Sequence, residues 1–152
     1  MPAPYDGGCV CGAVRYRLTE EPLTFYACHC TDCRGHAGAA YGLSMMVRRD
    51  ALAIVHGTAH TYDVEASDGR RRRGVGCAAC MTRLWGEPPR VPTVRILRPG
   101  TLDDPQGFRP VAHIWTRSKL PWVVIPADEP VFEQQPPDPR ALVDLWRARH
   151  PR

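Results

Sequence analysis

The sequence predicts a mainly β protein that carries one short helix near its C-terminus. Among its 152 residues are 16 prolines and 13 glycines, and this content favours short strands and turns over long helices. Apolar side chains alternate along several short segments, as they do in half-buried strands. The length is enough for one domain built around a single core.

The predicted strands follow one another from the N-terminal part onward. In residues 12–20, Val14, Tyr16 and Leu18 fall on one face. Residues 22–27 form a short strand that leads into a loop rich in cysteine, and the compact apolar residues 39–47 suit a buried strand. Later strands are expected over residues 51–57, 59–65 and 70–77, before the segments 82–88 and 92–100, and finally over residues 109–117.

The character of the chain changes after residue 134. Residues 1–134 are predicted to form one domain, and residues 135–152 a linker followed by an amphipathic helix. Asp138 suits the N-cap and Pro139 the first helical position of a helix over residues 139–149. Four side chains then recur at helical spacing: Leu142, Leu145, Trp146 and Arg149. The helix either docks on the body of the protein or on a second subunit, or it frays. Its apolar stripe permits a homodimer.

Charge and hydropathy exclude several classes of protein. The net charge of +4 suits a small anionic substrate but is too weak to argue for nucleic acid. The arginine run at residues 70–73 falls on a predicted strand, alternates between two faces and lacks aromatic neighbours for base stacking, so a solvated hairpin edge is favoured. No apolar run approaches the ~18 residues of a membrane span. The start of the chain does not resemble a signal peptide, so we expect a cytoplasmic protein without a membrane or nucleic-acid partner.

Seven cysteines fall into three tight groups, which is the strongest functional signal in the sequence. The groups are Cys9 and Cys11; Cys28, Cys30 and Cys33; and Cys77 and Cys80. A disulfide framework would spread its cysteines, and an odd number would leave one over. In a reducing compartment such grouping indicates metal binding or thiol chemistry.

The two outer pairs together suit a structural zinc site. Zinc takes four tetrahedral ligands at such sites, and a C-x-C or C-x-x-C pair supplies two thiolates from one turn. Two such turns, carrying Cys9, Cys11, Cys77 and Cys80, would close a four-cysteine site. The metal would then tie the first strand to the middle of the chain, which stabilises the fold by closing a long loop.

The middle group of three cysteines suits a zinc ion with one open position, which is the pattern of a catalytic zinc. Water or the sulfur of a thiol substrate would take that position, and zinc would hold the thiol as a reactive thiolate. Spacing alone also allows Cys77 and Cys80 to join the middle group, leaving Cys9 and Cys11 free. A redox role of Cys30 and Cys33 is the main rival, although no clear helical run follows them.

Two histidines and one arginine near these groups each have two interpretations. His29, between two cysteines, is a ligand or proton carrier, or it points to solvent. For His113, on the last predicted strand, a buried hydrogen-bonded side chain is favoured over a pocket-lining one. Arg34 either steers a substrate carboxylate or lies on a surface loop.

Four segments together resemble the glutathione-dependent formaldehyde-activating enzyme family. They are GGCVCGAVRY, CHCTDCRGHAGAAYG, CAAC and PGTLDDPQGFRPVAHIWTRSKLPW, and they stand in family order within residues 7–132. The resemblance implies a β-tent fold of twisted antiparallel sheets with zinc-binding loops, here over residues 1–134. It implies a structural zinc on Cys9, Cys11, Cys77 and Cys80, and a second zinc, linked to catalysis, on Cys28, Cys30 and Cys33. The family's glycine after the second C-x-x-C is Met81 in this chain.

The family reaction joins glutathione to formaldehyde as S-hydroxymethylglutathione, or reverses this carbon–sulfur lyase step. The resemblance therefore implies a zinc-dependent enzyme that handles a thiol–aldehyde adduct, with glutathione or a similar small thiol as its partner. Two other classes of function remain open on the residues alone. One is a non-catalytic zinc module that binds a protein or polyanion, and the other is a redox or metal sensor that uses the three-cysteine group.

Overall fold

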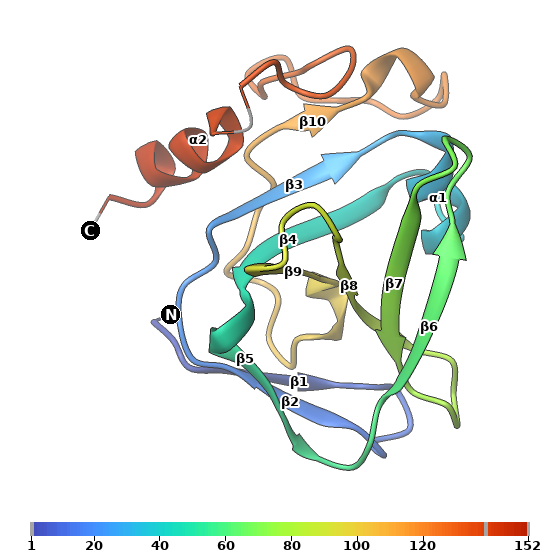
Figure 1. The fold of residues 1–152 in the computed structure, drawn as a ribbon. Helices are drawn as coiled ribbons and strands as arrows, with labels where there is room; N and C mark the ends of the chain where they lie inside the picture. The colour runs from blue at the N-terminus through green and yellow to red at the C-terminus, as the bar shows by residue number, and fades with distance from the viewer. Residues whose placement is uncertain (1, 139, 152) are drawn as a thin grey trace. The chain divides into compact units, whose positions relative to one another are not determined.

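The structure is a computed structural model that describes residues 2–138 and 140–151 (Figure 1). The chain divides into two compact units, one holding residues 1–22 and 45–107 and the other residues 23–44 and 108–152. Strands dominate both units, and the two α-helices of the described ranges are short. The predicted mainly β architecture, with cysteine-bearing loops and a short C-terminal helix, is confirmed.

The first unit contains a three-stranded antiparallel sheet in the order β1-β2-β5. Its strands are β1 (Tyr5–Gly8), β2 (Arg15–Leu18) and β5 (Leu52–His56). Tyr16 and Leu18 on β2 are fully buried, as the alternation of apolar residues predicts. The sequence did not predict β1, which pairs Tyr5 with Leu18 and so brings the first cysteine pair to the end of a strand.

The same unit contains a second run of antiparallel strands, in the order β4-β9-β8-β7-β6. They are β4 (Gly42–Arg48, which begins in the second unit), β9 (Val94–Leu97), β8 (Arg83–Glu87), β7 (Arg71–Gly76) and β6 (His60–Glu65). Short 3-10 turns lie at Arg49–Ala51 and Pro99–Thr101. Met45, Leu84, Trp85 and Leu97 fill the core beneath these strands. Burying such side chains stabilises the unit by roughly 1.5–3 kcal/mol each.

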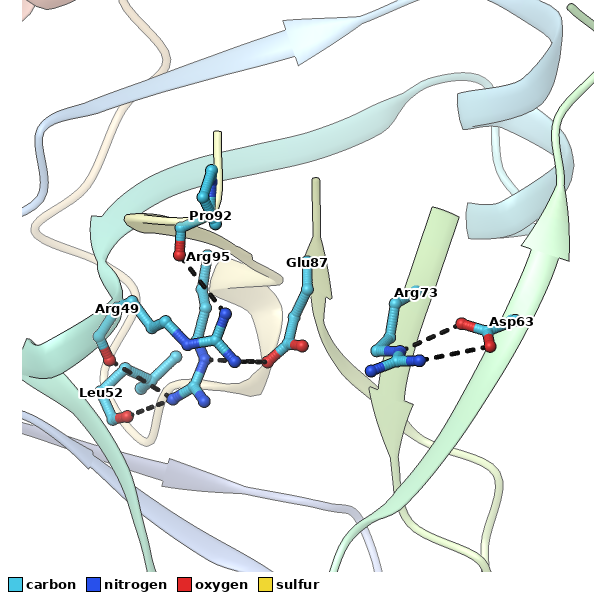
Figure 2. Close-up of polar contacts among 7 residues, drawn as sticks. All are labelled: Arg49, Leu52, Asp63, Arg73, Glu87, Pro92 and Arg95. Carbon is cyan, nitrogen blue, oxygen red and sulfur yellow. Dashed lines mark hydrogen bonds and ion pairs between the residues drawn. The ribbon is translucent and has the colours of Figure 1, made fainter. Parts of the chain in front are cut away.

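Ion pairs hold the polar side of this run together (Figure 2). The Arg95 guanidinium donates to Glu87 Oε1 at 3.1 Å and to the Leu52 carbonyl oxygen at 2.5 Å. Arg73 donates to Asp63 across the β6–β7 hairpin at 3.0 Å. Three of the four arginines of the run, residues 71–73, lie on β7, between β6 and β8, and not on the edge strand that the sequence suggests.

The second unit is organised around β3 (Thr24–Cys28), which pairs in parallel with β10 (His113–Ile114). The sheets are therefore not entirely antiparallel. The predicted strand over residues 109–117 is much shorter in the structure, because Trp115 adopts a left-handed backbone with φ 58° and a 3-10 turn follows at Thr116–Ser118.

A helix that the sequence analysis missed follows β3 directly. It is α1 (Thr31–Ala37), which ends at Gly38 in the left-handed conformation with φ 61°. Its turns contain no buried residue, so the apolar periodicity by which a helix is recognised is missing. The prediction that no helix follows Cys30 is therefore wrong, since Cys30 caps α1 and Cys33 lies in its first turn.

The C-terminal helix α2 (Ala141–Arg149) packs on β3 (Figure 1). Leu142 and Trp146 are buried, the Thr24 hydroxyl donates to the Leu142 carbonyl at 2.8 Å, and Trp146 stacks on His150 at 3.9 Å. The apolar stripe is thus buried against this chain's own strand. Pro139, the predicted first helical residue, lies outside the described residues, and the domain boundary at residue 134 stays a prediction.

No helix within residues 2–138 or 140–151 combines the length and the apolar character that crossing a membrane requires.

We predict that Trp146→Ala lowers the free energy of unfolding by about 3 kcal/mol, because it removes a large buried side chain from the contact between α2 and β3. Urea unfolding followed by tryptophan fluorescence and circular dichroism measures the change. Arg147→Ala is the matched control on the same helix, since Arg147 is largely exposed and its ion pair with Asp144 spans 3.8 Å. Equal stability of the two variants would show that α2 does not contribute to the core.

Candidate metal centres

The structure brings the four outer cysteines together in the first unit. The sulfur atoms of Cys9, Cys11, Cys77 and Cys80 all lie within 4.8 Å of one another. The Sγ atoms of Cys9 and Cys11 are 3.6 Å apart, and those of Cys11 and Cys77 are 3.7 Å apart. Two turns that are far apart in the sequence thus form one cluster of sulfur atoms.

Each turn is closed by its own backbone hydrogen bonds. The Cys9 amide donates to the Val14 carbonyl at 3.0 Å, and Gly12, with φ 79°, donates back to the Cys9 carbonyl at 3.0 Å. After β7, the Cys77 amide donates to the Thr82 carbonyl at 2.9 Å. The Val10 amide donates to Thr82 Oγ1 at 3.2 Å, which joins the two turns directly.

The spacing of the sulfurs fits a tetrahedral zinc ion. A Zn–S bond of about 2.3 Å places two sulfurs of a tetrahedron about 3.8 Å apart, close to the two separations in this cluster. The pKa values of two of these thiols are shifted in opposite directions. The Thr82 hydroxyl, with backbone amides, lowers the pKa of Cys80 to about 5. Although the Ala13 amide acts in the opposite direction, the neighbouring sulfurs raise the pKa of Cys11 to about 11.

Met81 occupies the left-handed conformation that a glycine would adopt more easily. Its φ is 62° and its side chain is 89% exposed. The Met81 amide still donates to the Cys77 carbonyl at 2.9 Å, so the turn closes as it would with glycine. The departure from the family pattern therefore adds backbone strain but removes no sulfur from the cluster.

The three middle cysteines form a second cluster, in the second unit. Cys28 ends β3, Cys30 is the N-cap of α1, and Cys33 lies in its first turn. Their sulfurs all lie within 4.8 Å of one another. The Cys33 amide donates to Cys30 Sγ at 3.2 Å, so the start of the helix fixes the position of that sulfur.

This cluster could supply three of the four ligands of a tetrahedral metal ion. Within residues 2–138 and 140–151, no further cysteine, histidine or acidic side chain belongs to it. Cys28 is buried, while Cys30 and Cys33 are partly exposed. The adjacent sulfurs of Cys30 and Cys33, together with burial, raise the pKa of Cys28. Three sulfurs at this distance can all ionise only when a cation balances their charge, so the donor set fits a bound metal ion.

His29 is neither a member of this sulfur cluster nor a solvent-facing residue. It is completely buried, and its Nε2 lies 2.8 Å from His113 Nδ1. Burial, followed by the electrostatic effect of His113, Lys119 and Arg34, lowers the pKa of His29 to about 4. The expectation that His113 is a buried, hydrogen-bonded histidine is confirmed.

Glu129 forms a hydrogen bond with the other nitrogen of the His113 ring. Its Oε2 lies 2.7 Å from His113 Nε2, and its Oε1 accepts from Arg109 Nε at 2.9 Å. The sequence analysis missed Glu129, because a single glutamate in an irregular segment carries no motif that would single it out.

Arg34 in α1 donates to the Ser118 carbonyl at 3.0 Å. One guanidinium nitrogen therefore anchors the helix to the turn after β10. That Arg34 also steers a substrate carboxylate stays a prediction.

Three comparisons place the chain among known proteins. The profile of a family described as "Glutathione-dependent formaldehyde-activating enzyme" matches residues 4–118. A Halomonas elongata protein named "Putative glutathione-dependent formaldehyde-activating enzyme" is 33% identical over 130 residues, which are 82% of this chain and 82% of that protein. A crystal structure of a Rhodobacter sphaeroides protein aligns with a TM-score of 0.53, covering 84% of this chain and 98% of that one. Its sequence identity of 18% limits that likeness to the fold.

We predict that Met81→Gly raises the free energy of unfolding by about 0.5–1 kcal/mol. Glycine removes the cost of the left-handed conformation, about 1–2 kcal/mol, and this gain exceeds the greater entropy of glycine in the unfolded chain. Val10→Gly is the control, because Val10 is equally exposed in the partner turn but has no positive φ. That variant should lose about 0.5–1 kcal/mol. Urea unfolding in the presence of zinc measures the free energy of unfolding of both variants. Destabilisation by Met81→Gly would show that the left-handed backbone at Met81 is not strained.

Proposed function

This chain belongs to the glutathione-dependent formaldehyde-activating enzyme family, and we propose that it joins a small thiol such as glutathione to formaldehyde or releases them again. The proposal is carried by one observation, the group of three cysteine sulfurs that no fourth donor among the described residues completes. Such a group leaves a ligand position for the sulfur of a substrate. The net charge of +4 suits an anionic thiol of the glutathione type.

We assign separate roles to the two cysteine clusters. Cys9, Cys11, Cys77 and Cys80 would hold a structural zinc ion, since four sulfurs complete a tetrahedron. Cys28, Cys30 and Cys33 would hold a second zinc ion at the catalytic site. Zinc bound there supplies the positive charge that lowers the pKa of a thiol and keeps it as a thiolate.

In the proposed reaction the thiolate sulfur forms a bond with the carbonyl carbon of the aldehyde. The π bond of the carbonyl breaks, its electron pair goes to oxygen, and that oxygen takes one proton to give the hydroxymethyl thioether. In the reverse direction the hydroxyl loses its proton and the carbon–sulfur bond breaks, which is a carbon–sulfur lyase step. The partly exposed Cys30 and Cys33 mark the side from which the substrate reaches the cluster, since Cys28 is buried.

A redox or metal-sensing role is the second candidate, and one observation favours it. Cys30 and Cys33 begin a helix, and an amide of that helix donates to Cys30 Sγ, an arrangement that stabilises a thiolate. In that case oxidised glutathione would take two electrons from the pair and leave a disulfide. The seven cysteines form no disulfide bonds among the described residues, which suits the reducing cytoplasm that we propose as the compartment.

We predict that the two clusters respond differently to the loss of one sulfur. Cys30→Ser should remain folded and retain about one zinc per chain, whereas Cys80→Ser should lose the structural zinc and unfold cooperatively at a lower temperature. Metal analysis of protein purified without chelator, together with thermal unfolding, tests this. The unaltered chain should carry about two zinc ions. If both variants retain the same zinc content and stability, the two-site assignment is wrong.

We predict that glutathione binds to the zinc-loaded protein through its sulfur. Titration calorimetry should show binding of glutathione and at least tenfold weaker binding of S-methylglutathione, which has no thiol to ionise. Cys33→Ser should abolish this preference. Equal affinity for the two compounds would contradict the proposal, and a single zinc ion with a Cys30–Cys33 disulfide in oxidised glutathione would support the sensor instead.

A further inference from the structure

A line of three buried, hydrogen-bonded side chains ends beside the three-cysteine cluster. Glu129 Oε2 lies 2.7 Å from His113 Nε2, and His113 Nδ1 lies 2.8 Å from His29 Nε2. The exposed fractions of Glu129, His113 and His29 are 9%, 7% and 0%. Because His29 stands between Cys28 and Cys30 in the chain, this line ends in the turn that carries two of the three sulfurs.

The ionisation state of Glu129 determines which atoms along this line donate hydrogen bonds and which accept them. Burial by itself raises its pKa, but hydrogen bonds from Arg109 and His113 hold the pKa of this carboxyl below its ordinary value. An ionised carboxylate only accepts hydrogen bonds. His113 Nε2–H therefore donates to Glu129, and in the neutral ring His113 Nδ1 accepts from His29 Nε2–H.

This pattern selects one tautomer of His29. Its proton lies on Nε2, and its Nδ1 carries a lone pair. Within residues 2–138 and 140–151, no group forms a hydrogen bond with that Nδ1 atom. The side-chain hydrogen bond that holds the His29 ring is consequently the one to His113.

The middle member of the line is held rigidly by its backbone. The His113 amide donates to the Pro130 carbonyl at 2.9 Å, and the His113 carbonyl accepts from the Phe132 amide at 2.9 Å. On its other side β10 pairs with β3, where the His29 amide donates to the Ile114 carbonyl at 3.0 Å. The Tyr41 ring lies 4.9 Å from the His29 ring. The backbone thus fixes the position of His113, and the hydrogen bond from His29 to His113 fixes the orientation of the His29 ring.

We propose that Glu129 and His113 are positioning residues for the three-cysteine site, which they reach by fixing the tautomer and ring orientation of His29. The inference rests on the proposed function in that the three cysteines must hold a metal ion. A ring fixed between Cys28 and Cys30 limits the backbone conformations of both. The two sulfurs are thereby held near the arrangement that the ion requires, before the ion binds.

Outer partners of this kind matter for affinity, since their loss in metal sites weakens binding about 10–100-fold. In this chain the effect reaches the sulfurs through the backbone of His29. Loss of Glu129 or His113 should therefore weaken metal binding at one cluster and leave the other unchanged, which a general loss of stability would not do.

Substitution of His113 tests the line at its centre. His113→Leu removes the acceptor for His29, while His113→Asn places a side-chain oxygen close to the former position of Nδ1. We expect chelator competition to show zinc binding at the three-cysteine cluster about tenfold weaker in His113→Leu, with most of the loss restored in His113→Asn. The four-cysteine site of the same molecule serves as the internal reference and should keep its affinity in both variants.

Glu129→Gln tests the direction of the line. An amide donates as well as accepts, so it no longer selects one tautomer. We expect nitrogen-15 NMR to show His29 protonated on Nε2 in the unaltered protein and as a mixture of tautomers in Glu129→Gln, with weaker zinc binding at the three-cysteine cluster. Glu87→Gln is the matched control, because Glu87 is a partly buried carboxylate that also binds arginine (Figure 2).

The outcomes separate this inference from the proposed function. If the unaltered protein binds zinc at the three-cysteine cluster and His113→Leu and Glu129→Gln bind it equally well, the positioning role is wrong and the proposed function stands. If the unaltered cluster binds no zinc, the proposed function is wrong, and the inference is overturned with it. Loss of zinc from both clusters in His113→Leu but not in Glu87→Gln would indicate general destabilisation and would also overturn it.

Discussion

Four cysteine sulfurs within 4.8 Å of one another are the constraint on which the first unit depends. Cys11 and Cys77 stand 66 positions apart in the chain, and their turns follow the first strand and the arginine-rich strand. Crowded thiols cannot all ionise unless a cation balances their charge. A metal ion at this position would therefore link folding of the N-terminal strands to folding of the β6–β7–β8 strands, because neither turn supplies enough donors by itself.

In the second unit only three sulfurs meet, and they too can all ionise only when a cation balances their charge. Here the surrounding structure is a strand followed by a helix, and the backbone of α1 contributes a hydrogen bond to one sulfur. Cys28 is buried while its two partners are partly exposed. The difference between the clusters lies in the number of donors and in access from outside, and these two properties distinguish a metal that stabilises a fold from one that can accept a substrate.

Local spacing explains how much of this arrangement could be predicted from the sequence. C-x-C and C-x-x-C pairs need only a tight turn, so the members of each pair could be recognised without a fold. Spacing favoured one site on Cys9, Cys11, Cys77 and Cys80, but it also allowed Cys77 and Cys80 to join the middle group. The choice between the two depends on strand pairing, and the family resemblance supported the first. The short helix α1 escaped because it buries no residue. The last strand was predicted too long because nothing in the sequence marks Trp115 as left-handed. Glu129 escaped because it lies in an irregular segment, 16 residues from its partner His113.

The central claim is that the three-cysteine cluster holds a metal ion with a position left for a thiol. X-ray absorption at the zinc edge of the fully loaded protein tests it most directly, because it counts the sulfur ligands around each ion. One site with four sulfurs and one with three give an average of about 3.5 sulfurs per zinc. Saturating glutathione should raise this average to about 4, with one new Zn–S bond of about 2.3 Å. An average of 4 before glutathione is added, or one that glutathione leaves unchanged, would contradict it.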